Sequence, residues 1–184
     1  MSELTYRASD ASAQSTAYVE SLSAALGSRD PIEVLTEMPS ALRNAIARLT
    51  SKQEQTPERE GKWSVRHVVQ HLADSELVGA FRYRMLLAHD APALPGYDQD
   101  AWADRLRYAD TDIPTALGDF AALRLMNLRL LRRATPVELR RVMRHAERGE
   151  ESLQTMIRMY AGHDIVHLRQ ILRIRQAIGA AGQA

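Results

Sequence analysis

The 184-residue sequence contains no cysteine, and this absence removes several kinds of chemistry at once. Disulfides, thiolate nucleophiles, zinc ribbons and iron–sulfur clusters all require cysteine side chains. Metal binding or nucleophilic chemistry must therefore use His, Asp, Glu, Ser, Thr, Tyr or Lys, and the chain has only six histidines. Any reactive sulfur has to arrive on a substrate.

An excess of charge of one sign is also absent. The chain has 24 Lys and Arg against 23 Asp and Glu, a formal net charge of +1. Dedicated nucleic-acid-binding domains are strongly basic, so nucleic acid is not an expected partner. Eight arginines between 124 and 148 are interpreted as a solvated face or an anion-attracting rim. They are Arg124, Arg129, Arg132, Arg133, Arg140, Arg141, Arg144 and Arg148.

Long apolar runs are missing as well. No run approaches the roughly 18 residues that a membrane span requires, and the polar start of both charge signs does not resemble a signal peptide. We therefore expect a cytoplasmic protein without a membrane segment. The length and ordinary composition predict one domain over residues 1–184.

Aromatic residues make up only 5% of the chain, and no long stretch alternates apolar and polar residues. Apolar residues instead recur at spacings of three and four, which predicts an all-α protein. Four substantial helices, an extra N-terminal helix and a long crossover over 89–110 predict a four-helix bundle. The expected helices cover about 12–26, Pro39 to about 49, 64–88, a stretch capped by Thr111 or Asp112, a short one from Pro136 that stops before Gly149, and about 150–178.

The last of these helices carries the clearest functional signal. His163 and His167 occupy successive positions of its apolar stripe, so their Cα atoms lie about 6 Å apart on one face. Two imidazoles at this spacing can converge on one metal ion. A single buried histidine is more often a hydrogen-bonded core residue, but two in succession favour metal ligation.

A third ligand is available on the helix over 64–88, where His71 shares a face with Val68 and Val78. The pair His67 and His71 is a rival arrangement, although His67 is expected to face solvent. His89 is expected at the surface. His145 is also expected to be exposed, with a position near a pocket mouth as the alternative.

Three further residues near His71 are weaker catalytic candidates. Asp74 and Ser75 follow His71 by three and four residues and could orient a ligand or a water, while Arg82 could bind a carboxylate or phosphate. Local helix polarity explains the first two equally simply, and a solvated or ion-paired face explains Arg82.

Four further residues are expected to form the surroundings of these candidates. Glu76 is expected to pair with an arginine, and Asp164 to pack against another helix. Tyr97 and Trp102, in the crossover, form either a wall over the metal or a closure of the core.

Three segments together resemble the DinB/YfiT-like superfamily of metal-dependent four-helix proteins. They read GKWSVRHVVQHLADSE over 61–76, HAERG over 145–149 and AGHDIVHLRQ over 161–170, and the likeness covers about residues 35–178. The resemblance implies an up-down-down-up bundle and a divalent metal ion, zinc or nickel, on His71, His163 and His167. It also implies a homodimer.

Two activities follow from this resemblance. The metal would activate either a water for hydrolysis or a small thiol, such as bacillithiol or mycothiol, for S-transfer to a small-molecule electrophile. The alternative is a non-catalytic, stress-associated dimer that binds metal through the same three histidines.

Overall fold

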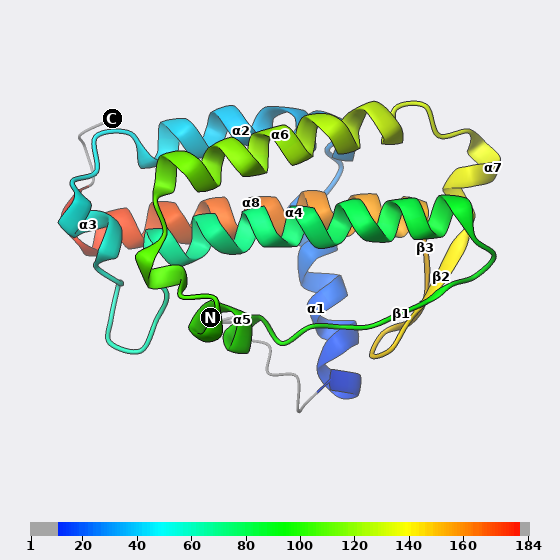
Figure 1. Cartoon of the computed structure of the whole chain (residues 1–184), viewed down its shortest axis with the longest axis horizontal. Coiled ribbons are helices and arrows are strands. Elements are labelled where there is room, and N and C mark those ends of the chain that lie inside the picture. Colours follow the sequence, from blue (N-terminus) through cyan, green and yellow to red (C-terminus); the bar gives the residue numbers. More distant parts are fainter. Residues whose placement is uncertain (1–10, 181–184) are drawn as a thin grey trace.

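The computed structural model describes residues 11–180, and its long helices form a four-helix bundle (Figure 1). Two of them, α4 and α6, run in the same direction, while α2 and α8 run in the opposite direction. The expected up-down-down-up arrangement is therefore confirmed. The four helices are α2 (Pro31–Ile46), α4 (Val65–Ala88), α6 (Ile113–Leu131) and α8 (Leu153–Ala177).

The extra N-terminal helix, α1 (Ala11–Leu26), crosses the bundle and packs against α8. The contact is close at Gly162 of α8, where an added Cβ atom would meet the backbone oxygen of Leu22 at 2.2 Å. A residue without a side chain at 162 is therefore what lets α1 approach the bundle.

Capping side chains fix where three of the long helices begin. Asp30, Asp112 and Ser152 each accept a hydrogen bond from the backbone N–H three residues later. The expectation that a helix begins at Pro39 was wrong, because α2 begins eight residues earlier at Pro31 and continues through Pro39. The polar segment after α2 also contains a short helix, α3 (Ser51–Gln55).

The all-helical expectation was wrong for one small part of the chain. The helix expected up to Gly149 is limited to α7 (Pro136–Leu139), and α8 begins at Leu153 rather than near 150. Between them lies a hairpin of β2 (Val142–His145) and β3 (Gly149–Ser152), whose turn uses the positive φ of Gly149. Strands of four residues are too short to produce a clear alternating pattern.

The long crossover is anchored to this hairpin. Its strand β1 (Ala93–Leu94) pairs in parallel with β2, placing Leu94 opposite His145. The chain then runs back along α4 to α5 (Gln99–Arg105) and the 3-10 helix η2 (Tyr108–Asp110) (Figure 1). The crossover thereby forms a cover along one side of α4.

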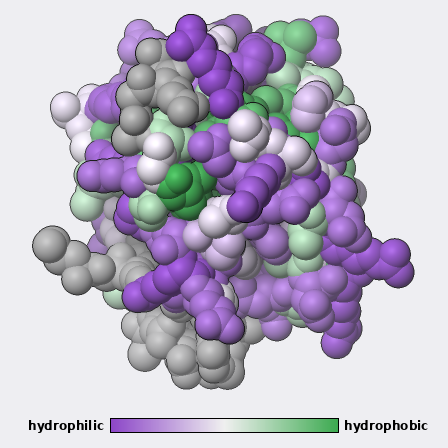
Figure 2. All heavy atoms as spheres, turned by 90° about the vertical axis from the view of Figure 1, so that its left-hand side faces the viewer, coloured by the Kyte–Doolittle hydropathy of each residue, from purple (hydrophilic) through white to green (hydrophobic). Residues whose placement is uncertain are grey.

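The buried core consists of two apolar clusters separated by a polar layer. One cluster includes Tyr83 and Leu153, and the other includes Val65 and Phe120. Between them Arg124 bridges buried carboxylates of α4 and α8. The end face near α3 is largely hydrophilic, with only small apolar areas (Figure 2). Within residues 11–180, no helix is long and apolar enough to cross a membrane.

Candidate metal centre

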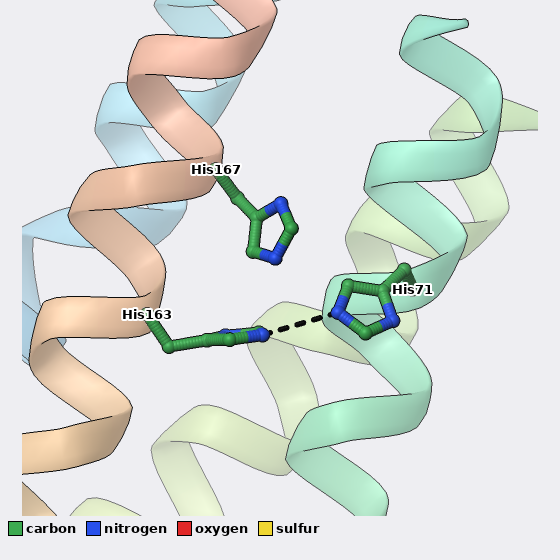
Figure 3. A group of neighbouring side chains, drawn as sticks. All are labelled: His71, His163 and His167. Carbon is green, nitrogen blue, oxygen red and sulfur yellow. Dashed lines mark hydrogen bonds between the residues drawn. The ribbon is translucent and has the colours of Figure 1, made fainter. Parts of the chain in front are cut away.

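Three histidine side chains converge between two helices that face each other (Figure 3). His71 extends from α4, and His163 and His167 extend from successive turns of α8. The three residues offer ligand nitrogens that all lie within 4.8 Å of one another, and Nε2 of His71 lies 3.1 Å from Nε2 of His163. The structure thus brings together the three histidines that the sequence singled out.

Burial keeps these imidazoles in the form that binds metals. His71 is 1% exposed, and His163 and His167 are partly buried. Burial lowers the pKa values of His71 and His163 well below the ordinary histidine value, and the neighbouring imidazoles lower them further. The pKa of His167 is lowered by burial to about 4. At neutral pH all three rings are uncharged, and an uncharged imidazole has a lone pair for a metal ion.

Hydrogen bonding orients one of the rings toward the centre. Nδ1 of His167 lies 2.8 Å from Oε1 of Gln170, which can only accept, so Nδ1 carries the proton and Nε2 keeps the lone pair. The ring of His71 lies under Trp63, at 5.0 Å between centroids, and its Nδ1 is buried without a partner among the described residues.

The donor set fits a divalent ion. Nitrogens that bind zinc tetrahedrally at about 2.0–2.1 Å are about 3.3 Å apart, close to the 3.1 Å between His71 and His163. Imidazole ligands suit zinc, nickel, copper and iron, so they do not select one metal. Three histidine ligands leave a coordination position open, as in catalytic rather than structural zinc sites.

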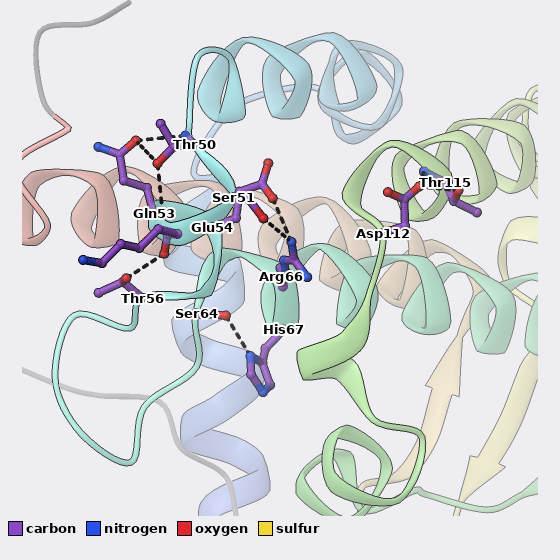
Figure 4. Close-up of polar contacts among 11 residues, drawn as sticks. Thr50, Ser51, Gln53, Glu54, Thr56, Ser64, Arg66, His67, Asp112 and Thr115 are labelled. Atoms are coloured by element: carbon purple, nitrogen blue, oxygen red, sulfur yellow. Dashed lines mark hydrogen bonds and ion pairs between the residues drawn. The ribbon is translucent and has the colours of Figure 1, made fainter.

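The other histidines lie outside this cluster. His67 is partly buried near the start of α4, with Nδ1 2.9 Å from the Ser64 hydroxyl (Figure 4), so the rival pair with His71 does not form. His89 is exposed, as expected. The expectation of an exposed His145 was wrong: it is 3% exposed, because its position in β2 points it into the molecule.

A cavity of about 100 Å³, partly open to solvent, lies beside the histidine cluster. His71 and His163 line one part of it, and Arg82 and His145 line another. Ser75 lies on the same wall, with its hydroxyl 2.8 Å from that of Tyr97. Two of the three weaker candidates, Ser75 and Arg82, therefore face the cavity.

The third candidate, Asp74, is directed elsewhere. Its carboxylate accepts hydrogen bonds from Tyr108 at 2.5 Å and from Gln70 at 3.1 Å. The bond from Tyr108 ties η2 of the crossover to α4. Asp74 therefore holds the cover of the bundle in place rather than lining the cavity.

The structure places the two crossover aromatics against each other beside the cavity. Tyr97 lines the cavity, while the ring of Trp102 packs against Tyr97 with 4.5 Å between centroids. Burial raises the pKa of Tyr97 above its ordinary value, so its hydroxyl stays protonated.

The polar layer lies directly behind the histidines. Glu76 and Asp164 both form ion pairs with Arg124 of α6. The expected pairing of Glu76 with an arginine and the expected contact of Asp164 with another helix are therefore confirmed. Arg124 is 2% exposed, so its assignment to a solvated basic face was wrong. Two carboxylates compensate its charge and make this burial possible.

Known proteins resemble this chain in sequence and in fold. Residues 35–171 match the DinB superfamily. YfiT of Bacillus subtilis, named as a proposed metal-dependent hydrolase, is 34% identical over 152 residues, covering 80% of this chain and 84% of YfiT. A protein of Oceanobacillus iheyensis with the same description is 32% identical over 140 residues, covering 76% and 81% of the two chains.

The solved structure of YfiT superimposes with a TM-score of 0.77 at 31% identity, covering 81% of this chain and 86% of that chain. That structure is described as a probable metal-dependent hydrolase with an unusual four-helix bundle topology. Sequence and structure agree on the same relationship, and the chain belongs to the DinB superfamily.

Proposed function

We propose that this protein is a metal-dependent hydrolase whose divalent ion is held by His71, His163 and His167. The observation that carries the proposal is the convergence of their ligand nitrogens, all within 4.8 Å, at the edge of a cavity. The descriptions of the relatives as metal-dependent hydrolases support it. Zinc and nickel are the proposed ions, because the resemblance to the DinB/YfiT-like superfamily implies them and both accept imidazole ligands.

When bound to three imidazoles, such an ion acts as a Lewis acid and lowers the pKa of a water molecule toward neutrality. The chain's own residues supply binding and orientation. Gln170 fixes the ring of His167, and Trp63 covers the ring of His71. The Ser75 and Tyr97 hydroxyls form a hydrogen-bonded pair on the cavity wall, where they can donate to a polar group of a substrate.

The resemblance offers a low-molecular-weight thiol as an alternative to water. The chain has no cysteine, so S-transfer here requires a thiol from solution. Hydrolysis and S-transfer share the same proposed ligands and differ in the nucleophile. The choice between them is therefore made by adding thiols to an activity assay.

Metal analysis tests the ligand assignment directly. Protein purified without a histidine tag is expected to hold about one divalent ion per chain, and His163→Ala and His71→Ala are expected to lose it. His89→Ala is the matched control, because His89 is exposed at the far end of α4. Equal metal content in wild type and His163→Ala would contradict the proposed site.

Activity assays then distinguish hydrolysis, S-transfer and a non-catalytic role. Metal-dependent cleavage of ester or amide substrates without added thiol supports hydrolysis. If an electrophile is turned over only when a small thiol is added, the reaction is S-transfer rather than hydrolysis. Metal that stabilises the fold but supports neither reaction identifies a non-catalytic metal protein and overturns the proposal.

A further inference from the structure

Arg82 is a buried cation without a carboxylate partner. It is 6% exposed and lines the same cavity as His71 and His163. One of its terminal nitrogens, NH2, donates a hydrogen bond to the backbone oxygen of Pro95 at 2.8 Å. Within residues 11–180, no acidic side chain forms an ion pair with it.

Other enclosed arginines of the chain satisfy their donors differently. Arg124 contacts two carboxylates, and the partly buried Arg148 binds the carboxylate of Glu151. Arg175 donates to three backbone carbonyl oxygens. A buried charge is costly unless it is paired. Arg82 has one backbone carbonyl oxygen, that of Pro95, and a hydrogen bond with the Tyr160 hydroxyl, so its remaining donors are available to a negative group from solution.

A second donor faces the same place. The backbone N–H of Glu147 donates to Nδ1 of His145 at 3.2 Å, so the proton of the neutral ring is on Nε2. That Nε2 lies 3.2 Å from the NH2 group of Arg82, which also can only donate. Two donors that face each other lack an acceptor. An anionic oxygen between them would accept from both.

Two acidic residues that line the cavity, Asp98 and Glu147, have contacts of their own. Asp98 accepts hydrogen bonds from the backbone N–H groups of Asp100 and Ala101 and so caps α5. The carboxylate of Glu147 packs against Gly96, where an added Cβ would meet it at 2.6 Å. Since Arg148 is neutralised by Glu151, Arg82 is the guanidinium of the described cavity lining that forms no ion pair with a described carboxylate.

We propose that Arg82 and His145 bind the carboxylate of a small monocarboxylic substrate, whose reacting group extends toward His71 and His163. The carboxylates of Asp98 and Glu147 in the same lining repel a dianion, so a group with one negative charge suits Arg82 better than phosphate does. Guanidinium groups bind carboxylates with paired N–H donors. This inference rests on the proposed function, because it names the substrate class of the same site.

The cavity, which is partly open to solvent, also indicates how large a part of the substrate can lie inside it. His71 and Arg82 are eleven positions apart on α4, about 16 Å at the rise of an α-helix. Side chains on an α-helix incline toward its N-terminus, which for Arg82 is the direction of His71. Leu22, Met159 and Tyr160 line the space between polar groups. For scale, a dry cavity of about 150 Å³ holds benzene. A cavity of about 100 Å³ suits a short aliphatic chain.

Binding of hexanoate to metal-free protein tests the inference without relying on catalysis. Isothermal titration calorimetry is expected to show saturable binding of hexanoate, and weaker binding of the uncharged hexanol and of inorganic phosphate. Arg82→Gln is expected to weaken hexanoate binding by about 10- to 100-fold, as for loss of a hydrogen bond to a charged group. Arg133→Gln, at an exposed arginine, is the charge-matched control and should bind as wild type does.

Two further measurements keep the test decisive. Circular dichroism establishes whether Arg82→Gln is folded; if it is not, Arg82→Lys keeps the charge and removes the planar guanidinium. In wild-type protein, nuclear Overhauser effects should connect hexanoate with the rings of His145 and Tyr160. Equal hexanoate binding in wild type and Arg82→Gln, equal binding of hexanol, or tighter binding of phosphate would overturn the inference.

The two proposals fail separately. Arg82→Gln should keep the metal content of wild type. His167→Ala, whose side chain is not part of the cavity lining, should keep hexanoate binding while losing metal. Hexanoate binding by a protein that never holds metal would contradict the proposed function and leave the carboxylate site supported. Metal binding without hexanoate binding would contradict the carboxylate site and leave the proposed function supported.

Discussion

The guanidinium of Arg124 donates a hydrogen bond to the backbone oxygen of Leu35 at 2.9 Å. Leu35 is four residues before Pro39, which has no N–H to complete the helical hydrogen bond to that oxygen. Arg124 therefore replaces the missing donor and also bridges Glu76 and Asp164. One side chain of α6 thus connects α2, α4 and α8 at the level of the histidines.

Replacing this arginine should strongly destabilise the bundle. Arg124→Met leaves two buried carboxylates without a counter-ion, and removal of one partner of a buried ion pair costs about 3–5 kcal/mol. Urea unfolding should show this loss, whereas Arg129→Met, at an exposed position of the same helix, should change stability by less than about 0.5 kcal/mol. Similar unfolding midpoints for the two variants would contradict the role assigned to Arg124.

Arg124 also shows why sequence patterns predict the presence of helices better than the residues at which they begin and end. The spacing of apolar residues and the capping residues located α4 almost to the residue, and they located the start of α6. Because proline is common at the first position of a helix, the sequence predicts a helix start at Pro39. Its tolerance inside α2 depends on Arg124, which is 85 positions away in the chain and so leaves no local signal.

Metal binding should stabilise the protein without being required for its helices. Two apolar clusters hold the bundle together on either side of the polar layer, so metal-free protein should keep its helical circular dichroism. Zinc or nickel at 100 times its dissociation constant should add about 2.7 kcal/mol to the stability. Thermal unfolding with and without chelator measures this shift, which should disappear in His167→Ala. Complete unfolding on chelation would show instead that the metal is an obligatory structural element.

Two glycines in helix interiors should respond oppositely to alanine. At Gly162 a new Cβ would meet the backbone of Leu22, so Gly162→Ala should separate α1 from α8 and cost about 1–3 kcal/mol. At Gly118, in α6, nothing lies within 4 Å of the new atom, and Gly118→Ala should stabilise by about 0.5–1 kcal/mol. Chemical denaturation of both variants checks the pair. Stabilisation by Gly162→Ala would contradict the close packing of α1.

The candidate site was foreseen only where its residues lie on long helices. His71, His163 and His167 could be placed together because helical periodicity puts each on an inward face. His145 could not, because it lies on a four-residue strand that is positioned by pairing with Leu94 of the distant crossover. His145 is therefore placed beside Arg82 by a long-range strand pairing, which a local sequence pattern does not reveal.

The buried His145 should make stability depend on pH. Burial, together with Arg148 and Arg82, lowers the pKa of His145 to about 4 in the folded protein, compared with about 6.5 in the unfolded chain. Between these values the unfolded chain binds a proton that the folded protein does not, so stability falls as the pH decreases from about 6.5 to 4. His145→Gln removes this contribution, and its free energy of unfolding should fall less steeply over that range. Urea titrations of metal-free protein from pH 7 to 4.5 measure the slopes, with His89→Gln as the exposed control. Parallel curves for wild type and His145→Gln would show that the ring is not held neutral by its burial.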